Sequence, residues 1–119
     1  TGLICLTGSN ETAKKLYELN PAVEMIAETG GKNSMIVTAI SDRDLAISDI
    51  VKSAFGHSGQ KCSALSLLIL ENEVYKDPSF FRQLHDAVKS LPVGSAFDPR
   101  TKVVPLVNEP SGKLLRGLT

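Results

Sequence analysis

The sequence has 119 residues, of which 42% are hydrophobic, 13 are basic, 13 are acidic and two are cysteines. The charges cancel and the basic residues form no cluster, so we expect neither nucleic acid nor an anionic membrane surface as a partner. No apolar run approaches the roughly 20 residues of a membrane span, and the cysteines and histidines lack metal-ligand spacing, so we expect no membrane span, no metal site and a cytoplasmic location.

The first 20 residues are predicted to form a strand, a turn and a helix. Residues 1–6 are apolar and β-prone, and Ser9 or Asn10 is expected to cap a helix that ends before Pro21. A turn at a helix N-terminus is the generic phosphate cradle of nucleotide-binding folds, because backbone N–H groups and the helix dipole favour an anion. This turn holds only one glycine, so a plain strand-to-helix connection is an equally good interpretation of the residues alone.

Two further strands are predicted over residues 22–27 and 34–39, on either side of the segment Glu-Thr-Gly-Gly-Lys-Asn at residues 28–33. Glu28 follows the first of these strands directly, and a pair of glycines comes soon after it. This glutamate is either a solvated loop residue or a general base, held where flexible backbone lets a cofactor approach closely.

The second half of the chain continues the alternation of helices and strands. A helix is predicted over residues 41–55 with Ser41 as its N-cap, and a strand buried on both faces is predicted over residues 65–70. An aspartate followed by proline at residues 77–78 predicts the start of another helix. We expect that helix to pack on the sheet through an apolar stripe of Phe81, Leu84, Val88 and Leu91. Turn-forming residues fill 95–110, and a last helix is predicted after residue 110.

Cys62 lies in the segment Gly-Gln-Lys-Cys-Ser-Ala at residues 59–64, between the predicted helix and the apolar strand. A thiolate is a strong nucleophile at neutral pH, so an accessible cysteine at the end of a sheet is a candidate for covalent catalysis. A free cysteine is also often a small buried apolar residue, as we expect for Cys5. His57, five positions earlier, suggests a third interpretation, a cysteine hydrolase or acyltransferase with a Cys–His pair.

Three segments together resemble the aldehyde dehydrogenase superfamily: Thr-Gly-Ser before a helix at residues 7–9, the segment at residues 28–33, and Gly-Gln-Lys-Cys at residues 59–62. The 34 positions between Glu28 and Cys62 also match the spacing in that superfamily. The segment over residues 93–106 fits less well, because Val104 stands where a glycine is usual. With the threonine at position 29 and the serine at position 63, the sequence most resembles the pyrroline-5-carboxylate dehydrogenase subfamily. That subfamily includes the dehydrogenase half of bifunctional bacterial proline-oxidising enzymes.

The resemblance implies an α/β fold, a mostly parallel sheet with flanking helices. It implies that residues 1–31 end an NAD-binding domain and that residues 32–119 begin the catalytic domain. The implied activity is NAD-dependent oxidation of an aldehyde, glutamate semialdehyde in this subfamily, through a cysteine thiohemiacetal and thioester. The implied site residues are Cys62 and Glu28 for catalysis, Gly8, Ser9, Thr29 and Gly30 for the cofactor, and Ser63 and Phe55 for the substrate.

We further expect the chain to be a fragment of a longer enzyme, since it lacks an initiator methionine and begins inside a predicted strand. On this interpretation the parent enzyme is a homo-oligomer, fused in some cases to a proline dehydrogenase domain. The isolated 119 residues are expected to be inactive and prone to associate, because incomplete sheets expose strand edges and apolar faces. The alternative is a non-catalytic α/β interaction or scaffold fragment in which Cys62 is buried and unreactive.

Overall fold

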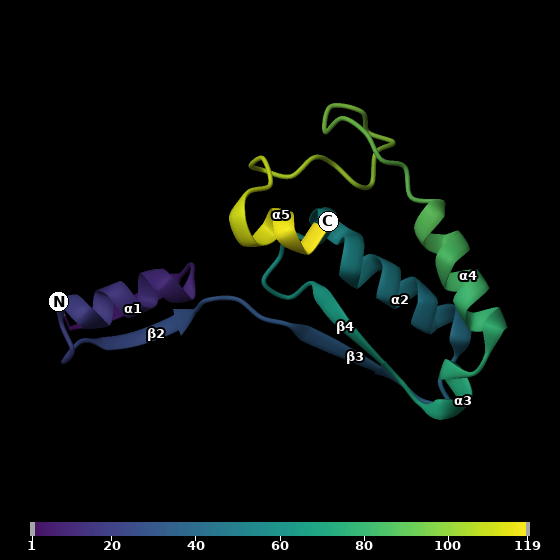
Figure 1. Ribbon diagram of the computed structural model, residues 1–119, viewed down its shortest axis with the longest axis horizontal. Coiled ribbons are helices and arrows are strands. Elements are labelled where there is room, and N and C mark those ends of the chain that lie inside the picture. The colour runs from purple at the N-terminus through teal and green to yellow at the C-terminus, as the bar shows by residue number, and fades with distance from the viewer. Residues whose placement is uncertain (1, 119) are drawn as a thin grey trace. The chain divides into compact units, whose positions relative to one another are not determined.

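The computed structural model describes residues 2–118, which form two compact units, Thr1–Lys32 and Asn33–Thr119 (Figure 1). Each unit is described by itself. The boundary between them falls one residue after the predicted domain boundary. The assignment of the two units to a cofactor domain and a catalytic domain stays a prediction. Among the described residues, no helix has the length and apolar character of a membrane span.

The first unit is a strand–helix–strand motif. Strand β1 (Leu3–Thr7) pairs in parallel with β2 (Glu24–Glu28), and α1 (Asn10–Leu19) connects them. Ser9 caps α1, because its hydroxyl oxygen accepts a hydrogen bond of 3.1 Å from the Thr12 backbone N–H. The register sets Thr7 opposite Glu28, so the carboxyl ends of both strands lie together.

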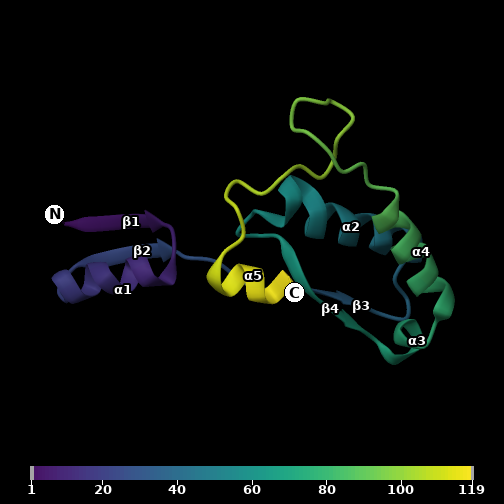
Figure 2. The same ribbon diagram turned by 45° about the horizontal axis from the view of Figure 1, so that its top comes forward.

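The second unit repeats the motif and adds helices. Strand β3 (Asn33–Val37) pairs in parallel with β4 (Leu65–Leu70), and the connection is α2 (Arg43–Phe55) followed by a 3₁₀ turn, η1 (Gly56–Gly59). Figure 2 shows α2 along one face of this strand pair. The helices that follow β4 are α3 (Asn72–Tyr75), α4 (Pro78–Lys89) and α5 (Gly112–Leu118). The predicted α/β class with parallel strands and flanking helices is confirmed.

The buried core of the second unit lies where α2, α4 and the strands meet. Its members are Val37, Ile47, Ile50, Val74 and Phe80. Residues from β3, β4 and α4 complete this core from partly buried positions. The core therefore holds the middle of α2, the helix that leads into the segment bearing Cys62.

Several local predictions are wrong. Asp42, not Ser41, caps α2 and accepts from the Leu45 N–H at 2.9 Å, because the Ser41 hydroxyl is engaged by the Thr38 backbone N–H at 3.1 Å. Strand β4 has the predicted bounds but is not buried on both faces, since α2 covers only one of them and Leu67 is 54% exposed. Cys5 is exposed as well.

The prediction for α4 is also wrong in part. The helix starts at Pro78 with Asp77 as its cap, as predicted. Its buried residue, however, is Phe80 at 1% exposure, whereas Phe81 of the predicted stripe is 42% exposed. The helix packs chiefly against α2 rather than on the sheet.

Candidate active site

The residues predicted to bind the cofactor lie together at the carboxyl ends of β1 and β2. The Gly8 N–H donates a hydrogen bond of 3.1 Å to the carbonyl oxygen of Glu28. Next to this contact, the Thr29 hydroxyl donates to the side-chain oxygen of Asn10. These two contacts join the turn after β1 to the turn after β2, so Gly8, Thr29 and their neighbours form one local surface.

This surface leaves the backbone open to a ligand. A side chain at Gly30 would meet no atom within 4 Å, and its φ of +129° is a conformation that favours glycine. A Cβ at Gly8 would touch only the Leu6 side chain at 3.4 Å, an ordinary contact. Because the ten-residue helix α1 begins directly after Ser9, its N-terminus adds a favourable potential for a phosphate group. These residues fit a dinucleotide.

Glu28 is the last residue of β2, and its side chain is exposed. The backbone carbonyl of Glu28 itself accepts the Gly8 N–H, so the end of the strand is fixed while the carboxylate stays accessible to solvent. Glu28 and Cys62 belong to different units of the chain. Their predicted convergence on one substrate therefore stays a prediction.

Cys62 lies on the segment that joins η1 to β4, which we call the thiol loop (residues 60–64). The thiol is exposed. Asn33, the first residue of β3, donates from its side-chain Nδ2 to the carbonyl oxygens of Cys62, at 2.7 Å, and Ala64, at 3.2 Å. A tight turn adds a backbone hydrogen bond of 3.1 Å from Ala64 N–H to the Lys61 carbonyl. The backbone around the cysteine is thus held while the residue stays exposed to solvent.

A second set of contacts ties η1 and the thiol loop to residues 104–107. The Ser58 hydroxyl donates to the Val104 carbonyl at 2.8 Å and accepts from the Val104 N–H at 2.9 Å. The Gln60 side-chain oxygen accepts from the Val107 N–H at 2.9 Å. Residues 104–107 therefore hold η1 and the thiol loop through contacts that are separate from those of Asn33.

Three successive residues before the thiol loop adopt left-handed backbone conformations. His57 has φ of 54°, Ser58 has 57° and Gly59 has 71°. The conformation is unfavourable for the first two, which carry a Cβ, at a cost on the order of 1 kcal/mol each. A Cβ at Gly59 would also approach the Ala54 carbonyl oxygen to 3.2 Å, so glycine suits this position both in φ and in space. The sharp reversal turns the chain from α2 back toward β4.

The two predicted substrate-binding residues line different cavities. Ser63 borders a cavity of about 190 Å³ beside the thiol loop, together with His57 and Lys61. Phe55 borders a cavity of about 430 Å³ between α2, α4 and residues 102–103. Cys62 lines neither of these two cavities. Ser63, itself in the thiol loop, thus lines one cavity, and Phe55 lines another toward α4.

His57 does not pair with the cysteine in the structure. Its backbone carbonyl accepts from Gln60 N–H at 3.1 Å, and within residues 2–118 no hydrogen bond joins its ring to the Cys62 thiol. Across the same residues, no group of three or more histidine, cysteine, aspartate or glutamate side chains is arranged to hold a metal ion.

Sequence reasoning missed Asn33, Ser58 and Gln60 as supports of the thiol loop. Asn33 belongs to the segment that prompted attention to Glu28, yet no role was assigned to it. The signal for Asn33 was its polar amide at the start of a strand. That strand pairs with the strand that follows Cys62. Ser58 and Gln60 gave no comparable signal, because their partners are backbone groups more than 40 positions away.

Comparison with known proteins places these features in a family context. The model of the "Aldehyde dehydrogenase family" matches residues 1–118. The 1-pyrroline-5-carboxylate dehydrogenase of Bacillus subtilis (strain 168) is 38% identical over an alignment of 119 positions that covers 93% of this chain and 23% of that protein. The chain therefore spans less than a quarter of the length of this curated relative.

Solved structures show the same likeness. Proline Utilization A (PutA) from Corynebacterium freiburgense superposes with a TM-score of 0.92 at 47% identity, over 100% of this chain and 12% of that chain. A 1-pyrroline-5-carboxylate dehydrogenase from Thermus with bound NAD gives a TM-score of 0.78 at 36% identity, over 90% of this chain and 22% of that one. The fold of both units is thus found within these larger proteins.

Proposed function

Because the chain belongs to the aldehyde dehydrogenase family, we propose that it carries the nucleophile and the general base of an enzyme that oxidises an aldehyde to a carboxylate. The proposed substrate is glutamate semialdehyde, the open form of pyrroline-5-carboxylate, and the product is glutamate. The observation that carries the proposal is the exposed thiol of Cys62 on a loop whose backbone is held by Asn33 and by residues 104–107.

The proposed cofactor is NAD, which accepts a hydride from the substrate carbon when it is bound. Gly8 and Ser9 are the residues that would lie under its diphosphate, next to the N-terminus of α1. Thr29 and Gly30 would border its nicotinamide through backbone contacts. The open backbone at Gly30 and the hydrogen bond between Gly8 and Glu28 support this assignment.

Cys62 is the proposed nucleophile. Its thiolate attacks the aldehyde carbon, so that a carbon–sulfur bond forms and the carbonyl oxygen takes the negative charge of a thiohemiacetal. Loss of hydride from that carbon restores the carbonyl and leaves a thioester on the sulfur. The exposed position of the sulfur supports this role, since attack needs direct access to the substrate.

Glu28 is the proposed general base of the second half of the reaction. Its carboxylate takes a proton from a water molecule as the water oxygen attacks the thioester carbonyl. The carbon–sulfur bond then breaks, and the Cys62 thiolate leaves as the carboxylate product forms. An exposed carboxylate at the end of a fixed strand supports a role in which water must reach it.

The proposed substrate rests on the relatives and on two residues. The B. subtilis protein, which is similar in sequence, and the Thermus protein, which is similar in fold, are named 1-pyrroline-5-carboxylate dehydrogenases. The Ser63 hydroxyl, next to Cys62, is proposed to donate a hydrogen bond to the substrate. Phe55 is proposed to supply an apolar wall for its methylene groups.

The assembly of the enzyme is also a proposal. We infer a homo-oligomer, fused in some family members to a proline dehydrogenase domain. The likeness to a PutA chain supports the fusion, because this chain covers 12% of that protein but 22% of the Thermus enzyme, so the PutA chain is the longer of the two.

The proposal is tested by following NADH formation by the full-length protein with glutamate semialdehyde, and with pentanal as an uncharged aldehyde of equal chain length. We expect Cys62→Ala to abolish turnover and Cys5→Ala, which removes the other exposed thiol, to leave it unchanged. Glu28→Gln is expected to release a first equivalent of NADH and then to turn over about 100-fold or more slowly, because the thioester persists. Glu24→Gln, at the other end of β2, is the matched control.

Other outcomes would favour the competing interpretations. Full activity in Cys62→Ala would exclude a covalent mechanism through this thiol. Slow alkylation of Cys62 in the folded protein, with no effect of NAD⁺, would favour a scaffold. Loss of thioester formation in His57→Ala would favour the Cys–His interpretation, whereas the proposed mechanism predicts little change.

A further inference from the structure

Asn33 contacts the thiol loop through one side-chain nitrogen that donates to two carbonyl oxygens. The acceptors are Cys62, at 2.7 Å, and Ala64, at 3.2 Å. We propose that Asn33 is a positioning residue, which sets the orientation of the Cys62 side chain for attack on the substrate. This inference rests on the proposed function of Cys62 as the nucleophile.

The first bond acts directly on the residue that carries the thiol. A peptide group is planar, so fixing the Cys62 carbonyl oxygen fixes the whole plane between Cys62 and Ser63. The second bond fixes the plane after Ala64 in the same way. With the turn bond from Ala64 N–H to Lys61, both sides of the cysteine are held, and rotation of the backbone that would swing the sulfur is restricted.

The β3–β4 pair is irregular at this position. Asn33 lies opposite Leu65, but the next residue, Ser34, lies opposite Leu67, so β4 contains one extra residue at this point. Such a bulge changes the direction in which a neighbouring side chain points, and bulges are often found beside active sites. The bulge is a second observation, independent of the hydrogen bonds, that sets Asn33 apart from an ordinary strand residue.

The chemistry of the side chain explains why an amide suits this position. The NH₂ group of asparagine has two hydrogens and no charge, so one nitrogen can serve two carbonyl oxygens. An alanine has no donor. An ionised aspartate has the same shape but only acceptor oxygens, which would face the two carbonyl oxygens and repel them.

A purely structural role for Asn33 predicts a different result from a positioning role. The contacts of Ser58 and Gln60 with residues 104–107 do not involve Asn33, so a protein changed at Asn33 is expected to stay folded. A structural residue would then alter stability and leave the rate per folded thiol unchanged. A positioning residue alters the rate at which the correctly placed thiol reacts, with little effect on substrate binding.

The experiment compares Asn33→Ala, Asn33→Asp and the control Asn72→Ala in the full-length protein. Asn72 lies at the start of α3, away from the thiol loop in sequence and in fold. We expect Asn33→Ala to lower kcat by about 10-fold with KM changed by less than about twofold, since two neutral hydrogen bonds are lost. Asn33→Asp is expected to lose at least as much at neutral pH, and Asn72→Ala to match the wild type.

Thiol labelling supplies a readout that a structural role would not move. Each variant is combined with Cys5→Ala, and Cys62 is labelled with a disulfide reagent that also reacts in acid. As the pH falls toward about 4, the carboxyl of Asn33→Asp gains a proton and can donate a hydrogen bond again. The labelling rate of Asn33→Asp relative to Asn33→Ala should therefore rise in acid, where the side chain at position 33 can donate again.

The outcomes separate this inference from the proposed function. If Cys62→Ala is inactive while both Asn33 variants match Asn72→Ala in kcat and labelling, the positioning role is overturned and the proposed function stands. If Cys62→Ala is active, both are overturned. A fall in kcat with a labelling ratio that does not change with pH would assign Asn33 to structural support alone.

Discussion

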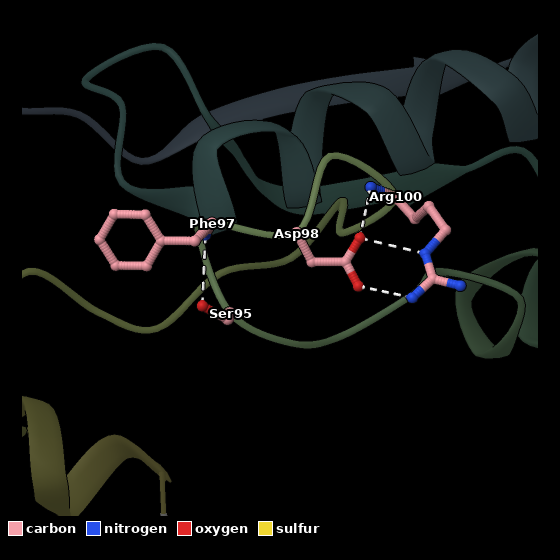
Figure 3. Close-up of polar contacts among 4 residues, drawn as sticks. All are labelled: Ser95, Phe97, Asp98 and Arg100. Carbon is pink, nitrogen blue, oxygen red and sulfur yellow. Dashed lines mark hydrogen bonds and ion pairs between the residues drawn. The ribbon is translucent and has the colours of Figure 1, made fainter.

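Asp98 and Arg100 show how a single side chain can organise an exposed turn. The Asp98 carboxylate accepts hydrogen bonds from the Arg100 guanidinium, at 3.1 Å from Nε and 2.9 Å from Nη2, and from the Arg100 backbone N–H at 3.0 Å (Figure 3). The guanidinium bonds, followed by the backbone bond, hold the pKa of Asp98 below its usual value. The pair is open to solvent, so its effect on overall stability is small.

The direction of the pH dependence follows from this lowered pKa. A carboxyl with a lower pKa in the folded state contributes stability above its unfolded pKa, and this contribution is lost as the pH falls through the folded value. We expect Arg100→Gln to raise the pKa of Asp98 toward the ordinary aspartate value, as measured by NMR titration of the side-chain carboxyl carbon. Arg82→Gln, on α4, is the control and should leave the Asp98 titration unchanged. An unchanged titration in Arg100→Gln would show that the pair does not form in solution.

At the scale of elements, α4 shows why an apolar sequence pattern does not by itself determine which face of a helix is buried. Phe80 and Phe81 are both spaced correctly to share a face with Leu84, three or four positions later. The structure buries Phe80 against the core with Leu84 and Ala87. Phe81 lies on the flank, where its ring meets Tyr75 edge-to-face at 6.1 Å. Which of the two phenylalanines is buried depends on the position of α2. The sequence of α4 does not encode that position.

This difference in burial predicts a difference in stability. Phe80→Ala should lower the free energy of unfolding by about 3–5 kcal/mol, the usual cost of emptying a buried phenylalanine site. Phe81→Ala should cost about 1 kcal/mol, mainly the lost ring contact. Urea unfolding of the purified protein measures both, and Phe80→Leu is the milder substitution if Phe80→Ala does not fold. Equal costs for the two alanine variants would contradict the assigned phase.

The elements that were predicted correctly are those whose signal is local. The apolar run over residues 65–70 and the Asp–Pro pair before α4 each define a boundary within a few residues of sequence. The residues predicted to bind the cofactor also lie together, because a strand–helix–strand motif sets the ends of its parallel strands side by side. The contact of Asn33 with Cys62 could not be predicted, since it depends on a bulge and a turn. The spacing of residues along the sequence does not determine the backbone direction in either of them.

At the scale of the whole molecule, the two units differ in how much they bury. The first unit has Val23, 8% exposed, as a buried apolar residue, and none of the residues in α1 is buried. The second unit has a cluster of five buried apolar residues. Since local opening costs least where few apolar groups are buried, the first unit should open more readily.

Hydrogen exchange tests this difference. We expect backbone amides of β1, α1 and β2 to exchange faster than those of α2 when peptides are analysed by mass spectrometry. If the first unit binds NAD as proposed, adding NAD⁺ should slow exchange there more than in α4, because a ligand stabilises the state that it binds. Equal protection of α1 and α2 without ligand would show that burial in this chain does not govern its opening.

The loop over residues 95–101 is a place where we expect the chain to tolerate inserted sequence. A bridge between Val93 and Val103 closes its base, and turn contacts such as Thr101 N–H to the Asp98 carbonyl hold its tip. Phe97 is 97% exposed at that tip. Exposed loop tips with a fixed base accept inserted sequence, because the rest of the fold does not depend on them. An epitope tag or a fluorescent reporter grafted beside Phe97 would therefore mark this protein without disturbing the segment around Cys62.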